Sequence, residues 1–152
     1  HSMAVGERTA EKIKIKIGSA FPDENFDNTT FEVRGLHLSS GLPRSITLTS
    51  GEVREAMSDP LNKIVESIKR TLERTPPELA ADIVERGIML AGGGALIRGI
   101  NDLVTKETGI FTHIAEDPLL CVVNGCGEIL DDFRKLKRIV DTIDVGTTSV
   151  RN

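Results

Sequence analysis

The chain has 152 residues and a formal net charge of −4, which excludes the broad basic surface that holds nucleic acid. Aromatic residues make up only 3%, with no tryptophan or tyrosine, so rings on which single-stranded bases stack are scarce. No apolar run approaches the roughly 20 residues of a transmembrane helix, so we expect no membrane span.

The length suffices for one domain or two small lobes with a hydrophobic core. His1, Ser2 and Met3 are interpreted as a tag remnant followed by a start methionine. Cys121 and Cys126 have no clustered histidines beside them. We therefore interpret both as small packing thiols in a reducing compartment, and we predict no metal site.

The first predicted element, at residues 6–17, has two patterns. Lysine and isoleucine alternate over residues 12–17, which favours a strand. Helical spacing of apolar residues, with two glutamates where a first turn would lie, favours a helix. The pattern alone leaves both open. Residues 18–28 follow as a loop, since they combine a proline with several Asp and Asn residues.

Two β-prone runs, at residues 30–38 and 44–49, flank a turn-forming cluster at 39–43, and together they predict a hairpin. A long helix should follow, because Thr49 and Glu52 can form a capping box. It should end before the two prolines at 76 and 77. The apolar face of this helix is Leu61, Ile64, Val65, Ile68 and Leu72.

The second half alternates helices and strands, which predicts an α/β fold. Residues 88–91 are continuously apolar, as in a strand buried on both faces. Gly125 and Gly127 would let the last helix pack closely. The predicted elements are a helix at 77–84, a strand at 88–91, glycines at 92–94, a helix from 97 to Gly109, a strand at 110–115 and a helix from 119 to about 136.

The strand–glycine–helix segment is the sharpest candidate site. Glycines let backbone approach a ligand closely, and a helix start offers free N–H groups. A dinucleotide fingerprint starting at Gly92 would need glycine or alanine at Ile97, and a P-loop would need lysine at Ile100. From spacing alone, a tight turn without a ligand stays open as the alternative.

The run from Gly92 to Leu96 resembles the adenosine motif of the actin superfamily in the form found in MreB proteins. Residues 6–15 resemble the MreB helix that faces this motif across the adenosine, which implies a helix there. Other pieces agree in order and spacing, and the resemblance covers about residues 5–132. These pieces are residues 33–35, 41–44, 75–80, 85–87, 107–109 and 115–118.

The resemblance implies the C-terminal lobe of an actin-like (ribonuclease H-like) α/β ATPase. It divides the chain into a small hairpin-and-helix subdomain at 5–75, part of a core α/β subdomain at 76–133 and a flexible tail at 134–152. The implied whole protein is a cytoskeletal filament of bacterial actin that binds ATP with Mg²⁺ and determines rod cell shape. The resemblance also implies that the whole protein self-associates into filaments. Its implied partners are cell-shape and cell-wall synthesis proteins at the cytoplasmic membrane.

Two segments supply the implied nucleoside-binding residues, and no catalytic residue is predicted. By analogy Glu11 would bind a ribose hydroxyl, Lys14 would lie along the adenine, and the backbone of Gly93 and Gly94 would meet the adenosine and α-phosphate. Without the resemblance, Glu11 and Lys14 would be interpreted as a solvated surface pair. The full set is Glu11, Lys12, Ile13, Lys14, Gly92, Gly93, Gly94, Ala95 and Leu96.

By the same comparison the chain begins after the family's phosphate-binding hairpins, so we expect it to be inactive as an ATPase on its own. Residues 143–148 resemble the first phosphate loop of actin-like ATPases, and both a flexible tail and a functional loop stay open there. Alternatives within the superfold are a sugar or acetate kinase and a chaperone-type ATPase. The sequence has no acceptor-binding constellation and no trace of a chaperone's partner domain.

Overall fold

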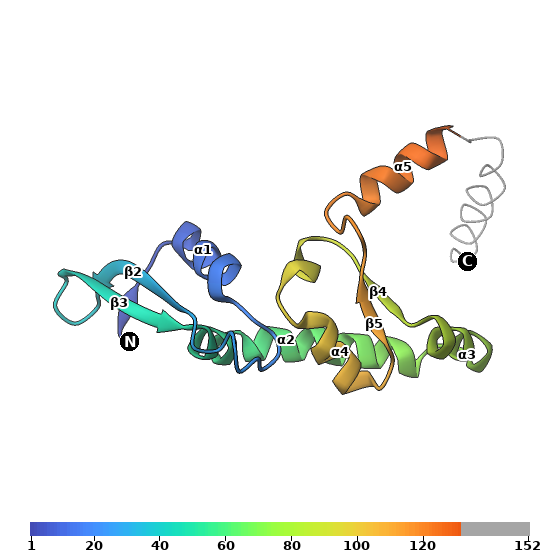
Figure 1. The fold of residues 1–152 in the computed structure, drawn as a ribbon, viewed down its shortest axis with the longest axis horizontal. Coiled ribbons are helices and arrows are strands. Elements are labelled where there is room, and N and C mark those ends of the chain that lie inside the picture. The colour runs from blue at the N-terminus through green and yellow to red at the C-terminus, as the bar shows by residue number, and fades with distance from the viewer. Residues whose placement is uncertain (132–152) are drawn as a thin grey trace, which may run out of the picture.

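The computed structural model describes residues 1–131, and they form an elongated molecule (Figure 1). The long helix α2 connects a hairpin end to an end that carries a small parallel sheet. In chain order the elements are β1 (Met3–Ala4), α1 (Glu7–Ile17), β2 (Thr30–His37), β3 (Pro43–Thr49), α2 (Ser50–Glu73), α3 (Pro77–Arg86), β4 (Ile88–Leu90), the 3₁₀ turn η1 (Gly93–Leu96), α4 (Ile100–Thr108), β5 (Thr112–Ile114) and α5 (Cys121–Asp131).

The first element is a helix, as the resemblance implied, and the strand pattern is misleading. Ile13 and Ile17 lie four residues apart on one helical face, and both are buried. Ile15, which a strand would place with them, is 70% exposed. Burial of one apolar face therefore outweighs the alternation of lysine and isoleucine.

The hairpin is confirmed. Strands β1, β2 and β3 form an antiparallel sheet in that order, and β2 pairs with β3 from Thr30↔Thr49 to Leu36↔Pro43. Gly41 has φ of +68° in the connecting turn, a conformation that glycine adopts without steric cost. One core cluster joins this sheet to α1 and α2: Ile13, Ile17, Val33 and Val53.

Helix α2 begins where the capping box predicts. The Glu52 N–H donates to Thr49 Oγ1 at 3.3 Å, and the Thr49 N–H donates to Glu52 Oε2 at 2.8 Å. The helix ends at Glu73, before the two prolines. On its apolar face Leu61 and Val65 are buried, so the predicted face is in part the packed one.

In the second half, β4 and β5 pair in parallel, from Ile88↔Thr112 to Leu90↔Ile114. This confirms the α/β prediction but corrects two details. Met89 is 63% exposed, so β4 is not buried on both faces; within residues 1–131 it has β5 as its one strand partner. Helix α4 begins at Ile100 and not at Ile97, because Ile97 is extended and Gly99 has φ of +73°.

Helix α5 extends away from the rest of the molecule (Figure 1), and none of its residues is buried. A Cβ added at Gly125 or Gly127 would meet no atom within 4 Å, so the predicted close packing at these glycines is wrong within the described part. Cys126 is exposed and Cys121 partly buried, so Cys126 is not a packing thiol. The predicted end of this helix near residue 136 lies outside the described residues.

A second core cluster joins the loop after α1 to the two central helices through Ala20 of the loop, Leu61 of α2 and Ile100 of α4. It therefore holds residues from both predicted subdomains together, and the boundary at residue 75 stays a prediction. The predicted tail at 134–152, with the loop-like residues 143–148, lies outside the described residues. No helix within residues 1–131 is long and apolar enough to cross a membrane.

Candidate functional site

A cavity of about 720 Å³ lies between α1 and the segment that follows β4. In Figure 1 both segments lie on the same side of α2. The cavity therefore brings together the two halves of the predicted site, although about 80 residues of sequence separate them. The predicted residues that line it are Glu11, Lys14, Gly93, Gly94 and Leu96.

The α1 wall is built by helical spacing. Glu11 and Lys14 lie three residues apart on one face, and Lys14 Nζ is 2.7 Å from Glu11 Oε2. Both side chains remain about half exposed, so they can also contact a ligand. The other two predicted residues of this turn face elsewhere: Ile13 is in the first core cluster, and Lys12 is exposed and is not among the lining residues.

The opposite wall is the glycine segment. Gly92 has φ of +81° directly after β4, which turns the chain into η1 and favours glycine. A Cβ at Gly94 would meet no atom within 4 Å, so the cavity side of this residue is open. Ala95 is buried, and neither it nor Gly92 is among the lining residues. The predicted helix start directly after the glycines is absent here, since α4 begins at Ile100.

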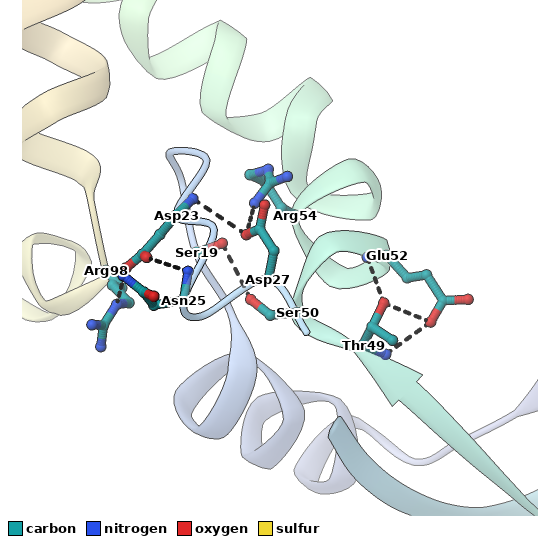
Figure 2. Close-up of polar contacts among 9 residues, drawn as sticks. All are labelled: Ser19, Asp23, Asn25, Asp27, Thr49, Ser50, Glu52, Arg54 and Arg98. Carbon is teal, nitrogen blue, oxygen red and sulfur yellow. Dashed lines mark hydrogen bonds and ion pairs between the residues drawn. The ribbon is translucent and has the colours of Figure 1, made fainter. Parts of the chain in front are cut away.

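Polar contacts connect loop residues 18–28 to α2 on one side and to Arg98 on the other (Figure 2). On the α2 side, Arg54 donates to Asp27, and Ser19 and Ser50 place their buried hydroxyl oxygens 3.4 Å apart. The hydrogen bond from Arg54 holds the pKa of Asp27 below its ordinary value. The loop is therefore fixed to α2 by a charged contact and by a buried polar one.

The cavity also has lining residues that the sequence did not indicate. Ile15 and Gly18 follow Glu11 at helical spacing, so they could have been found once the segment was assigned as a helix. Phe26, Arg98 and others come from separate segments and have no local signal. The lining residues missed are Ile15, Lys16, Gly18, Phe26, Ile97, Arg98 and Leu119.

Two of the three cations that line the cavity are paired with carboxylates. Lys14 is paired with Glu11, and Arg98 Nε lies 3.4 Å from Asp23 Oδ2. Lys16 adds a further cation to the lining. Carboxylate, ammonium and open glycine backbone together suit a ligand with hydroxyl groups and a flat polar ring better than a small, highly charged anion.

Sequence comparison identifies one protein family and several curated relatives. The family described as MreB/Mbl protein matches residues 1–138. The cell shape-determining protein Mbl of Bacillus subtilis (strain 168) is 45% identical over 138 residues, which cover 91% of this chain and 41% of the relative. The cell shape-determining protein MreB of Escherichia coli (strain K12) is 50% identical over 127 residues, covering 84% and 36%. The chain thus spans about two fifths of the length of these relatives.

Solved structures give the same picture. MreB5 of Spiroplasma citri bound to ADP is similar with a TM-score of 0.82 at 36% identity, over 90% of this chain and 41% of that one. The AMPPNP-bound form of MreB5 is similar with a TM-score of 0.80 at 36% identity, over 95% of this chain and 41% of that one. A double helical filament of MamK is similar with a TM-score of 0.60 at 20% identity, over 78% of this chain and 35% of that one. This likeness supports the shared fold alone.

Proposed function

Because the chain belongs to the MreB/Mbl family of actin-like proteins, we propose that the cavity between α1 and η1 binds the adenosine part of a nucleotide. The observation that carries this proposal is the meeting of two distant segments: Glu11 and Lys14 face Gly93 and Gly94 across one cavity. Its volume of about 720 Å³ falls in the range of small-molecule sites. The MreB5 structures with ADP and AMPPNP support a nucleotide as the ligand.

Each wall has a distinct chemical task in this proposal. The Glu11 carboxylate accepts a hydrogen bond from a ribose hydroxyl, and the stem of Lys14 lies along the adenine. Gly93 and Gly94 let the backbone meet the nucleoside and α-phosphate, since no Cβ intervenes. Leu96 is exposed in the cavity and gives the base an apolar surface. Lys12, Ile13, Gly92 and Ala95 then support these walls and do not contact the ligand.

For the whole protein we propose an ATP-dependent cytoskeletal filament that determines cell shape. The names of the relatives support this function, and they do not support the kinase or chaperone alternatives. Self-association into filaments is proposed from family membership. Partners from cell-wall synthesis, and a location in the cytoplasm beneath the membrane, belong to the same proposal.

We assign no side chain of residues 1–131 to the Mg²⁺ that the family resemblance implies for the full-length protein. Residues 1–131 contain no group of three or more His, Cys, Asp or Glu side chains that could hold a metal ion. We therefore assign the nucleoside, and not the metal or the phosphate chemistry, to the described residues.

A titration of the 152-residue chain with ADP, followed by amide chemical shifts, tests the site. We expect shift changes to concentrate at residues 11–14 and 93–96, with a weaker response at Phe26 and Arg98. Shift changes elsewhere, with the glycine segment silent, would refute the assignment of the cavity.

A further inference from the structure

The side chain of Arg98 connects the glycine wall of the cavity to the loop that follows α1. Its Cζ lies 4.2 Å from the centroid of the Phe26 ring, and its Nε donates to Asp23 Oδ2 at 3.4 Å. Figure 2 shows Arg98 and Asp23 facing each other from separate segments. Arg98 and Phe26 both line the cavity, so the stacked pair forms part of its surface.

The backbones of the two segments are in close contact at the same place. The Ala20 N–H donates to the Arg98 carbonyl at 2.7 Å, and Ser19 forms a parallel bridge with Arg98. Gly99 has φ of +73°, and a Cβ there would lie 2.8 Å from Phe21 Cβ. A residue with a side chain would force the segments apart, so glycine lets the loop approach the start of α4.

The other side of the loop is fixed to α2. Asp27 accepts from Arg54, and its carbonyl accepts from the Gly51 N–H at 3.2 Å. Helix α1 leads into this loop at Gly18. The position of η1 relative to α1 therefore depends on the contact around Arg98 together with the core cluster of Ala20, Leu61 and Ile100.

We propose that Arg98 is a positioning residue for the cavity: by stacking on Phe26 and pairing with Asp23, it sets the spacing and orientation of the α1 and η1 walls. This inference rests on the proposed nucleoside site and adds a residue that acts on both halves of it. The Arg98 side chain is 57% exposed and belongs to neither core cluster. Its removal should therefore leave the fold intact while loosening the walls.

The first measurement needs no ligand. Amide residual dipolar couplings report the orientation of each helix in the free chain, and we expect those of α1 and α4 to fit one alignment tensor in the parent. In Arg98→Ala the two helices should require different tensor magnitudes, because the contact between the loop and the glycine segment weakens. Arg44→Ala is the matched control, since it removes the same charge from an exposed position in β3.

The second measurement is the initial slope of the shift changes at residues 93–96 during titration with ADP and, separately, with uncharged adenosine. An exposed cation–π contact and an exposed ion pair together correspond to about a fivefold loss of affinity, and positioning predicts this loss for both ligands. Phe26→Leu should reproduce part of it, and the double variant should lose less than the two single losses combined. Arg98→Lys should restore little, because an ammonium lacks the planar face and the Nε donor.

The outcomes separate this inference from the proposed function. If Arg98→Ala keeps a single tensor and parental slopes, Arg98 does not position the walls. A loss confined to ADP would overturn the proposal and identify a direct phosphate contact. If the parent glycines respond to neither ligand, the proposed function fails, and the dipolar couplings still decide the role of Arg98. Should Arg98→Ala unfold, Phe26→Leu is judged by the same couplings.

Discussion

Gly94 gives the sharpest test at the scale of a single residue. Its Cβ position is open, so the protein itself leaves room for a side chain, and that room is the proposed nucleoside position. We predict that Gly94→Val abolishes the ADP-induced shift changes at residues 11–14, because a β-branched side chain occupies the space beside the Gly94 backbone that the nucleoside would enter. The fold should be retained, as judged by circular dichroism.

Gly6→Val is the control for this substitution. Gly6 also has open space at its Cβ position, and its backbone is extended, which suits valine. It is not among the lining residues of the cavity. Parental ADP shifts in Gly94→Val, or an equal loss in Gly6→Val, would count against the nucleoside site.

The pair of Asp27 and Arg54 predicts a pH dependence of stability. The hydrogen bond from Arg54 lowers the pKa of Asp27 below its ordinary value of 3.8, so the native state binds fewer protons than the unfolded state around that pH. The stabilisation is complete above the ordinary value and is lost as the pH falls below it. We expect Arg54→Met to lower the thermal midpoint at about pH 7 and to lower it by less at about pH 3, below the ordinary pKa of Asp27.

At each pH the thermal midpoint of Arg54→Met must be compared with that of the parent, because Glu52 and Glu107 also have lowered pKa values and add their own pH dependence to both proteins. The Thr49 N–H lowers that of Glu52, and Lys69 lowers that of Glu107. Both contribute equally to the parent and to Arg54→Met, so they cancel. An equal destabilisation at both pH values would show that Arg54 acts through packing of its stem instead.

At the scale of the element, local patterns predict the first half better than the second. Helix α2 has its start fixed by the Thr49–Glu52 box, which is a contact between near neighbours. The pattern of α1 is ambiguous, because the alternation of residues 12–17 favours a strand, whereas Ile13 and Ile17 are buried on one helical face against a sheet from later in the chain. Which face of an element is buried depends on what packs there, and a single segment does not contain that information.

The hairpin of β2 and β3 is the element that we expect to take part in assembly. Leu36, Leu38 and Leu42 near its turn are exposed and belong to neither core cluster of the described residues. Leu42 is 64% exposed. In a full-length family protein with this chain, Leu42→Asp should abolish ATP-dependent pelleting, because a charge would be buried at a subunit contact.

Leu42→Met is the matched variant, because it keeps an apolar side chain at the same position. It should pellet as the parent does, and circular dichroism should be native for both variants. Normal pelleting of Leu42→Asp would remove this residue from the subunit contact. A hairpin that unfolds in Leu42→Asp is not expected, since Leu42 lies in the turn outside both paired strands.

At the scale of the whole molecule, the candidate site shows where sequence patterns stop being informative. Residues 11–14 and 92–96 were indicated by resemblance to a family, yet only five of those nine residues line the cavity. Ile13 and Ala95 pack inward, as their apolar side chains allow. Phe26 and Arg98 meet across more than 70 residues of sequence, and tertiary contacts of that kind leave no periodic trace.

The isolated chain should have no measurable ATPase activity. Hydrolysis needs a positioned metal and a positioned water, and the one carboxylate that lines the cavity, Glu11, is assigned to the ribose. The measurement is phosphate release with ATP and Mg²⁺ after successive purification steps. Activity that stays proportional to this chain through those steps would show that a working phosphate site exists in it.

The chain should nevertheless bind adenosine nucleotides weakly, and ATP and adenosine should bind almost equally. Two or three hydrogen bonds at about 1 kcal/mol each, with partial burial of the base, stand against an association cost of at least about 4 kcal/mol. Lys14 and Arg98 are already paired with carboxylates, so phosphates gain little from them.

We therefore expect dissociation constants in the millimolar range or weaker, measured by shift titration with ATP and adenosine side by side. The ratio of the dissociation constants of ATP and adenosine is the informative quantity, because a ratio near one indicates a nucleoside site and a large difference indicates a phosphate site. Micromolar binding of ATP alone, with shift changes at residues 144–148, would contradict the prediction and indicate a functional phosphate loop there.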